Sequence, residues 1–165
     1  MNDCWVVNSS PIIILSKISR VEILLKLCRK LIIPEGVSSE ISQGPENDPG
    51  KVWLKENGFR YVPQKYAIEP PISNWDLGVG ESEVLAFALK NPGWIAVIDD
   101  RAARKCAYTL KIPFIGTLGV IWQAKKKGVL TKVRPVFQDL VQGGFRVEKG
   151  MLNALLEEAG EDPIS

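Results

Sequence analysis

Short apolar runs alternate along this chain with longer amphipathic stretches, and this alternation limits the fold more than any other feature. It is typical of a parallel sheet covered by helices, because each parallel strand needs a crossover before the next. The predicted strands are Cys4–Val7, Leu31–Ile33, Phe59–Val62, Trp94–Ile98 and Pro113–Ile115. The predicted helices are one capped by Ser10 with Pro11 at its first position, one within residues 20–30, and then Pro34–Ser42, Asp48–Glu56, Gly80–Leu89, Asp100–Leu110, Thr117–Lys127, Arg134–Val141 and Glu148–Glu158. We therefore expect an α/β fold with a mostly parallel sheet of about five strands.

Length and hydropathy predict a single domain over residues 1–165, because one hydrophobic core usually serves a chain of this size. No apolar run approaches the roughly 20 residues that span a bilayer, and the N-terminus lacks the pattern of a secretory leader. We therefore expect a soluble, cytoplasmic protein with no membrane partner. The segment from Pro63 to Gly80 has three prolines and is the longest predicted loop.

The absence of histidine narrows the possible chemistry. It excludes Ser-His-Asp and Cys-His nucleophile systems, histidine general bases and histidine metal ligands. The three cysteines lie far apart inside apolar segments, which predicts buried thiols rather than disulfides or a zinc site. Catalysis by this chain must therefore use carboxylates, lysines, hydroxyls or a metal ion held by oxygen ligands.

Polar side chains follow the two most convincing buried strands. Asn8 comes directly after "CWVV", and Asp99 and Asp100 come directly after "WIAVI". Ligands of open parallel sheets bind beyond the carboxyl ends of the strands, where the strand order reverses, so these side chains are expected to be neighbours. Adjacent like charges near a buried strand end are costly unless a cation lies between them. The alternative is that one aspartate caps the following helix while the other is solvated.

Two glutamates can reach the same edge of the sheet. Glu83 lies near the start of the helix "GESEVLAFAL", with Glu81 as its competitor, and Glu40 ends "PEGVSSEI", with Glu35 as the alternative. Glutamates in the first turn of a helix often serve only to interact favourably with the positive end of the helix dipole. Together with the aspartates, however, they suit a hard cation such as Mg²⁺ or Mn²⁺, which takes oxygen ligands and keeps several waters. Such an ion polarises a phosphate and activates water, so phosphodiester hydrolysis is the expected reaction.

Four segments resemble the PIN-domain nucleases, especially bacterial and archaeal relatives of VapC-type toxins. They are "VVNSSPIIILSKISRVEIL", "LIIPEGVSSEI", "LGVGESEVLAFAL" and "VIDDRAARKCAYTLKIPFIGTLGVI", which extend over nearly the whole chain. The resemblance implies a three-layer α/β/α fold and Mg²⁺- or Mn²⁺-dependent endoribonuclease activity, with RNA as substrate, a small antitoxin as partner and a possible homodimer. By this resemblance the metal ligands are Asn8, Glu40, Glu83 and Asp100, the catalytic residues are Glu40, Glu83, Asp99 and Asp100, and Ser9 or Ser10 supplies a supporting hydroxyl.

The chain departs from the family at Asn8, where aspartate is common. An amide oxygen can bind a metal but carries no charge, and a pair of unit charges about 4 Å apart is worth roughly 4 kcal/mol at an effective dielectric near 20. We expect weaker metal binding and reduced or Mn²⁺-dependent activity. The alternatives are a catalytically inactive relative that binds RNA or an antitoxin, and an Asn8 that only forms a turn.

Three basic residues follow the aspartate pair at helical spacing. Arg101, Arg104 and Lys105 are expected to bind RNA phosphates beside the metal, unless they form an ordinary solvated helix face. A receiver-like signalling domain would also place acids at a strand end. Such a domain would need a phosphoacceptor aspartate after a middle strand and a lysine across the pocket. Here the acid pair lies late in the sequence and only Lys111 lies downstream as a candidate lysine, so we rank this interpretation last.

Overall fold

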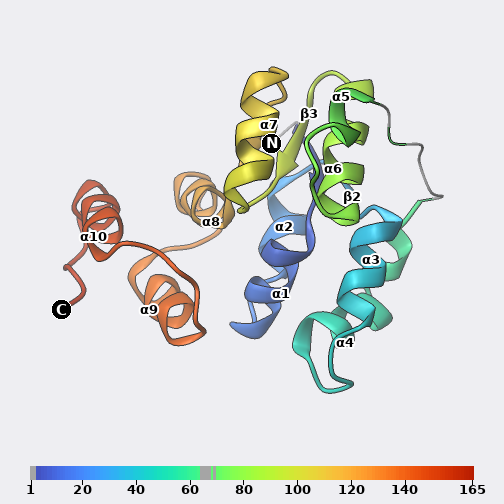
Figure 1. The fold of residues 1–165 in the computed structure, drawn as a ribbon. Helices are drawn as coiled ribbons and strands as arrows, with labels where there is room; N and C mark the ends of the chain where they lie inside the picture. The colour runs from blue at the N-terminus through green and yellow to red at the C-terminus, as the bar shows by residue number, and fades with distance from the viewer. Residues whose placement is uncertain (1–2, 64–67, 69) are drawn as a thin grey trace.

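The computed structural model describes residues 3–63, 68 and 70–165. Its strands are β1 (Cys4–Val7), β2 (Lys30–Ile32), β3 (Trp94–Val97) and β4 (Phe114–Ile115). Its helices are α1 (Ser9–Lys17), α2 (Glu22–Leu27), α3 (Glu35–Ser42), α4 (Pro49–Glu56), the 3₁₀ helix η1 (Gly58–Tyr61), α5 (Pro70–Ser73), α6 (Val79–Lys90), α7 (Arg101–Thr109), α8 (Thr117–Lys126), α9 (Arg134–Gln142) and α10 (Lys149–Glu158). The predicted alternation of strands and helices is confirmed (Figure 1).

The strands form one parallel sheet in the order β2-β1-β3-β4. Cys4 of β1 is paired with Lys30 of β2 and with Trp94 of β3, while Val97 is paired with Ile115 of β4. All four residues of β1 are buried, as expected for a central strand that is covered on both faces. The chain leaves β1 toward β2 but leaves β3 toward β4, so the strand order reverses between β1 and β3.

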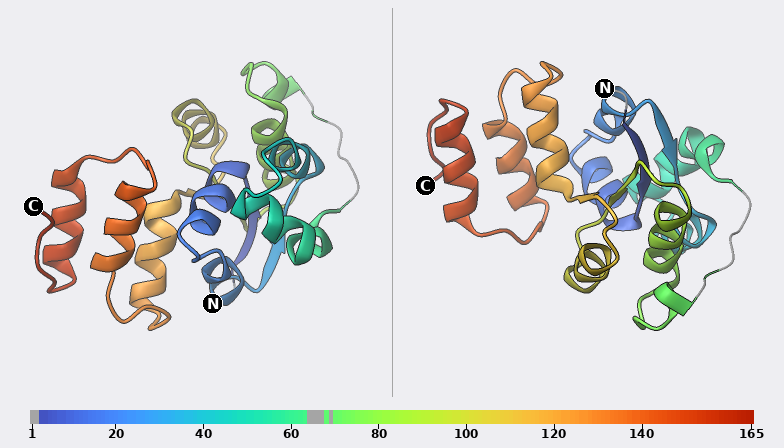
Figure 2. Two further views of the ribbon diagram at one scale, coloured as in Figure 1. Left: turned by 90° about the horizontal axis from the view of Figure 1, so that it is seen from below. Right: turned by 90° about the horizontal axis from the view of Figure 1, so that it is seen from above.

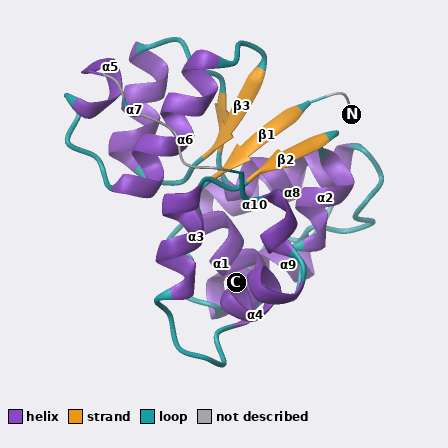
Figure 3. Ribbon diagram, turned by 90° about the vertical axis from the view of Figure 1, so that its right-hand side faces the viewer, coloured by secondary structure: helices purple, strands orange, loops and turns teal. Residues whose placement is uncertain are grey.

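Helices cover both faces of this sheet, which gives the predicted three-layer α/β/α architecture. Crossovers between parallel strands are right-handed, so connections that run in opposite directions along the sheet place their helices on opposite faces. Accordingly α6 and α7 lie on one face and α1, α2 and α8 on the other (Figure 3). The helix α3 packs against α1, α4 and α6, and α4 packs against α1 and α3. The helices α8, α9 and α10 stand side by side at one end of the molecule (Figure 2).

The predicted strand Phe59–Val62 is wrong, and within the described residues the sheet has four strands rather than about five. Residues 58–61 form η1, which joins the sheet edge by a single backbone bond from the Ile33 nitrogen to the Tyr61 oxygen at 2.9 Å. Phe59 is 57% exposed. One hydrogen bond and an outward aromatic residue do not continue a ladder, although the residue types favour a strand.

Two further expectations concern segment ends. The first helix begins at Ser9, one residue before the predicted cap Ser10, because Asn8 occupies the cap position without a capping bond from its side chain. The long segment from Pro63 to Gly80 contains α5 and the start of α6; its residues 64–67 and 69 lie outside the described residues. None of the helices in the described ranges is long and apolar enough to cross a membrane.

Candidate active site

The carboxyl ends of β1 and β3 meet where the strand order reverses. The Asn8 nitrogen donates to the Val97 oxygen at 3.0 Å, and Val7 is paired with Val97. Asn8 and Asp99 therefore leave neighbouring strands at the same edge of the sheet, as the sequence predicts. This is the position at which open α/β sheets bind ligands.

The side chain of Asn8 is buried at this edge and only partly bonded. Asn8 is 3% exposed, and its amide hydrogen-bonds to the Glu81 carboxylate. Burial raises the pKa of that carboxyl, and the bond from Asn8 opposes part of the rise. Its Oδ1 atom has no hydrogen-bond partner within the described part of the chain. A buried acceptor without a partner costs roughly 1–3 kcal/mol, so this oxygen is prepared for a ligand that the protein itself does not supply.

The two aspartates have different local partners. Asp100 caps α7 by accepting from the Ala103 nitrogen at 2.9 Å, as the capping alternative predicts. Asp99 is not simply solvated, because it accepts from the Thr117 nitrogen at 2.8 Å and from the Thr117 hydroxyl at 2.6 Å. Gly116 allows this approach, since a β-carbon there would lie 3.0 Å from Asp99 Oδ1. Asp99 thus fixes the start of α8, while Asp100 is exposed toward the cleft.

Glu40 joins three helices at the edge of the site. Its Oε2 accepts from the Ser9 hydroxyl at 2.8 Å, and its Oε1 accepts from the Gly80 nitrogen at 3.0 Å. The first serine therefore acts as the supporting hydroxyl for a carboxylate, whereas Ser10 is exposed and lines the cleft. A carboxylate has about four lone-pair positions, so Glu40 keeps acceptor capacity beyond these two bonds.

The structure separates Glu81 from Glu83. Glu81 lines the cleft, and burial raises the pKa of its carboxyl, with further raising by the negative charges of Asp100 and Glu40; hydrogen bonds from Gly78 and Asn8 oppose the rise. Glu83 is 0% exposed and faces α3, where its Oε2 accepts from the Gly36 nitrogen at 3.0 Å. Of the two glutamates, Glu81 is the one that the fold brings to Asp100 and Glu40.

The oxygen groups at this edge fit a hydrated divalent cation. No three Asp, Glu, Cys or His side chains in the described ranges come close enough together to hold a metal ion by themselves. Mg²⁺, however, usually binds through one or two carboxylates and keeps several waters. The unpaired Asn8 Oδ1 and the neighbouring charges of Glu81 and Asp100 provide such a set, and an added cation would relieve the mutual repulsion of the carboxylates.

Two of the three predicted basic residues lie in the same cleft. Arg101 and Arg104 line it, and the Arg104 guanidinium lies 5.3 Å from the centroid of the Phe114 ring, within the range of a cation–π contact. Lys105 does not line the cleft. Residues one position apart on a helix point about 100° apart, which explains why Lys105 turns away although it follows Arg104 directly.

The cleft has a volume of about 1360 Å³, and part of its lining has no counterpart in the sequence expectations. Residues 143–148, between α9 and α10, line it together with the acids after β1 and β3. These residues lie more than a hundred positions from Asn8 in the sequence, and they carry no catalytic motif. No signal short of the tertiary structure would place them beside the acids.

A protein-family model described as a PIN domain matches residues 4–161. No curated protein and no solved structure matches the chain.

Proposed function

This chain belongs to the PIN-domain family, a nuclease-type fold, and on that basis we propose that it is a metal-dependent endoribonuclease that hydrolyses RNA phosphodiester bonds in the cleft beyond β1 and β3. The observation that carries the proposal is the buried, unpaired Asn8 Oδ1 at the strand-order reversal, surrounded by carboxylates. The chain has no histidine to serve as a general base, so its carboxylates are the groups available to bind a metal or activate water.

The proposed metal ligands are Asn8, Glu81 and Asp100, and the Glu40 carboxylate lies near Glu81 with acceptor capacity to spare. We assign Glu81 in place of Glu83, because Glu81 lines the cleft beside Asp100, whereas Glu83 Oε2 is bonded to Gly36 of α3. Glu83 Oε1 is, like Asn8 Oδ1, buried without a partner in the described ranges, and neither Glu83 nor Glu40 lines the cleft. When bound, a divalent ion would polarise the phosphate and lower the pKa of a bound water. Glu40 positions the start of α6 through Gly80, and Asp99 positions the start of α8 through Thr117.

The amide of Asn8 changes the balance between the metal-free and metal-bound site. In the metal-free protein it donates a hydrogen bond to Glu81, where an aspartate would add a second negative charge. In the metal-bound site it supplies an oxygen without charge. Both effects favour the metal-free state relative to a chain with aspartate, so the proposed enzyme binds its metal weakly and depends on a high concentration of Mg²⁺ or on Mn²⁺.

The test is cleavage of a mixed-sequence single-stranded RNA in Mg²⁺, in Mn²⁺ and in EDTA. Wild type is compared with Asn8→Asp, with the double variant Asp99→Asn/Asp100→Asn, and with the matched pair Glu81→Gln and Glu83→Gln. We expect metal-dependent cleavage that increases in Asn8→Asp, is lost in the double variant, and falls more in Glu81→Gln than in folded Glu83→Gln. Metal-dependent cleavage that survives in the double variant would contradict this site.

A second candidate function is supported by Asn8 itself, because the amide donates to Glu81 without a metal and offsets part of the cost of burying that carboxylate. In this case the chain binds RNA or a small antitoxin without cutting RNA, as PIN domains commonly bind such partners. RNA binding in EDTA combined with no cleavage by any variant, including Asn8→Asp, would favour it. The toxin role, the homodimer and the cytoplasmic location remain predictions.

A further inference from the structure

The connection between α9 and α10 forms one side of the cleft and is fixed to the domain at its start. The Lys17 ammonium donates to the Gly143 oxygen at 2.8 Å, and the Phe145 nitrogen donates to the Leu140 oxygen at 2.9 Å. Gly144 lies between them with φ of 91°, a conformation that favours glycine. The chain therefore turns sharply after α9 and directs residues 145–148 along the cleft.

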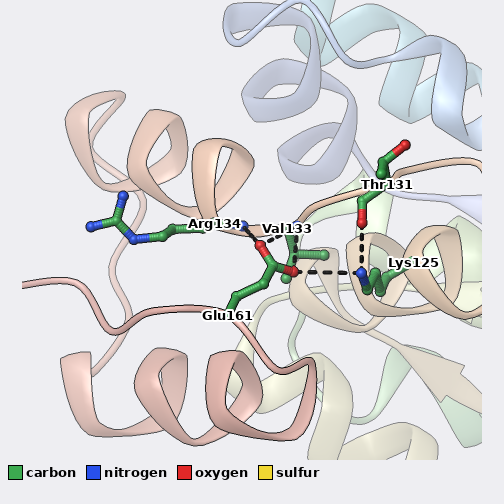
Figure 4. Close-up of polar contacts among 5 residues, drawn as sticks. All are labelled: Lys125, Thr131, Val133, Arg134 and Glu161. Carbon is green, nitrogen blue, oxygen red and sulfur yellow. Dashed lines mark hydrogen bonds and ion pairs between the residues drawn. The ribbon is translucent and has the colours of Figure 1, made fainter.

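The far end of this hairpin is also fastened, by a carboxylate that comes from the C-terminal segment (Figure 4). Glu161 accepts from the backbone nitrogens of Val133 and Arg134, at the start of α9, and lies 3.7 Å from the Lys125 ammonium of α8. These bonds join α8, α9 and the segment after α10. Residues 143–148, which we call the hairpin wall, are therefore held at their start by Lys17, and the helices α9 and α10 that they join are held at their other ends by Glu161.

The hairpin wall presents an aromatic ring beside a positive charge. Phe145 is partly buried against the core and lines the cleft, and Arg146 is exposed in the same cleft. Neither Arg146 nor Arg101 forms an ion pair with another residue of the described ranges. Free guanidinium groups match phosphate geometry, and an accessible ring accepts a stacked base.

We infer that the hairpin wall binds single-stranded nucleic acid, with one base stacked on Phe145 and a phosphate held by Arg146 and the arginines of α7. This inference deepens the proposed function by naming how the substrate is held. The cleft lining holds Arg101, Arg104 and Arg146 together with four carboxylates, one of them Glu148 of the hairpin wall. The arginines are therefore the groups that would hold a phosphate beside the acids. Bases within a duplex are already stacked and paired, so an unpaired strand is the form that can use the ring.

Binding is tested in EDTA by fluorescence anisotropy of a short labelled RNA of mixed sequence, so that no cleavage interferes. The variants are Phe145→Leu, Phe145→Tyr and Arg146→Gln. The chain offers a matched control in Phe59 and Arg60, another Phe-Arg pair with the guanidinium 5.5 Å from the ring centroid, which does not line the cleft. Phe59→Leu and Arg60→Gln therefore remove the same groups from a surface outside the cleft.

Phe145→Leu is expected to weaken binding roughly 5- to 100-fold, the loss of one stacked base, whereas Phe145→Tyr keeps a ring and retains the affinity. Arg146→Gln is expected to lower the salt dependence, log K against log salt, by about 0.7 for one lost phosphate contact. The two control variants leave both quantities unchanged. A single-stranded DNA of the same sequence should lose the same factor in Phe145→Leu, because stacking does not use the 2′-hydroxyl.

Two results would overturn the inference: wild type that binds duplex as tightly as single strand, or folded Phe145→Leu and Arg146→Gln variants that bind like wild type. Cleavage by wild type in Mn²⁺ is measured in parallel. If wild type cleaves RNA but the Phe145 and Arg146 variants bind it as tightly as wild type does, the inference about the hairpin wall is refuted and the proposed nuclease activity stands. If binding depends on these two residues but no cleavage occurs, the proposed nuclease activity is refuted and the inference about the hairpin wall stands.

Discussion

Replacing Glu161 with glutamine should weaken the C-terminal helices, because α9 has no cap from its own sequence. Val133 occupies the cap position, and its side chain makes no capping bond. Glu161 replaces it: Oε1 accepts from Arg134 nitrogen at 3.0 Å and Oε2 from Val133 nitrogen at 3.0 Å. The carboxylate also places a negative charge at the positive end of the helix dipole.

The magnitude follows from these contacts. Glutamine keeps one carbonyl oxygen but turns an amide toward the second backbone N–H, so one charge-assisted bond and the charge itself are lost. Hydrogen bonds to charged groups contribute about 1.5–3 kcal/mol each, and the Glu161 side chain is only 8% exposed, so solvent screening is small. We expect a loss of about 2 kcal/mol at pH 7, which lowers the Tm of a chain of this size by about 4–8 °C.

The pH dependence distinguishes a charge effect from a packing effect. Burial opposes ionisation of Glu161, but the N–H groups of Val133 and Arg134 and the Lys125 ammonium outweigh it and hold the pKa of the carboxyl below its usual 4.5. A group whose pKa is lowered by folding stabilises the protein above its unfolded pKa and loses that contribution as the pH falls through the folded pKa. The difference in free energy of unfolding between wild type and Glu161→Gln should therefore be constant from neutral pH to about pH 5 and become smaller as the pH falls below the unfolded pKa of the carboxyl.

The assay is urea unfolding of wild type and Glu161→Gln across this pH range, with Glu158→Gln as the control. Glu158 lies on α10, is exposed, and forms no ion pair within the described ranges. The control should stay within about 0.5 kcal/mol of wild type. A Glu161→Gln effect as small as the control, or one that grows as the pH falls from neutral, would refute the reasoning.

Two further substitutions test the acidic edge of the site. Gly80→Ala places a methyl group against the Glu40 carboxylate and should displace it, so cleavage falls. The free energy of unfolding should also fall, because the bonds to that carboxylate from Ser9 and Gly80, about 1.5–3 kcal/mol each, outweigh the roughly 0.5–1 kcal/mol by which alanine favours a helix. Gly150→Ala, where a β-carbon meets nothing within 4 Å, should stabilise α10 and leave cleavage unchanged. Asn8→Asp should lower the Tm in EDTA, because it removes the amide bond to Glu81 and adds a like charge, and Mn²⁺ should raise its Tm more than that of wild type. A Tm of Asn8→Asp that does not respond to Mn²⁺ would contradict the ligand assignment.

The order of strands and helices, and the polar residues at the strand ends, could be predicted from the sequence. Apolar runs such as "WIAVI" are too continuous for a half-exposed strand, and parallel strands buried on both faces have this pattern. A parallel sheet also places the residues after its central strands at one edge. For this reason Asn8, Asp99 and Asp100 could be selected before any coordinates were known, and the bond from Asn8 to Val97 confirms that their strands are adjacent.

Residue choice within a helix was decided by the tertiary structure. Glu81 and Glu83 both lie near the start of α6, and their side chains point about 200° apart around the helix axis. Local sequence cannot tell which of these directions faces the strand ends and which faces α3, because both neighbours lie far along the chain. Local sequence likewise cannot tell that Arg104 lines the cleft and that Lys105, the next residue of α7, does not. For η1, the residue types favour a strand, but in the described part of the chain one backbone hydrogen bond, from Ile33 to Tyr61, joins it to the sheet edge.

The hairpin wall and the Glu161 contacts belong wholly to the tertiary structure. Glu161 lies 27 residues beyond Arg134, and residues 143–148 line the same cleft as Asn8 although they are more than 130 residues away along the chain. Sequence patterns encode periodicity and local capping, which act over a few residues. The sequence thus determined which chemistry this protein can hold and at which edge of the sheet, and only the packing of α6 and of the α9–α10 hairpin decided which side chains reach it.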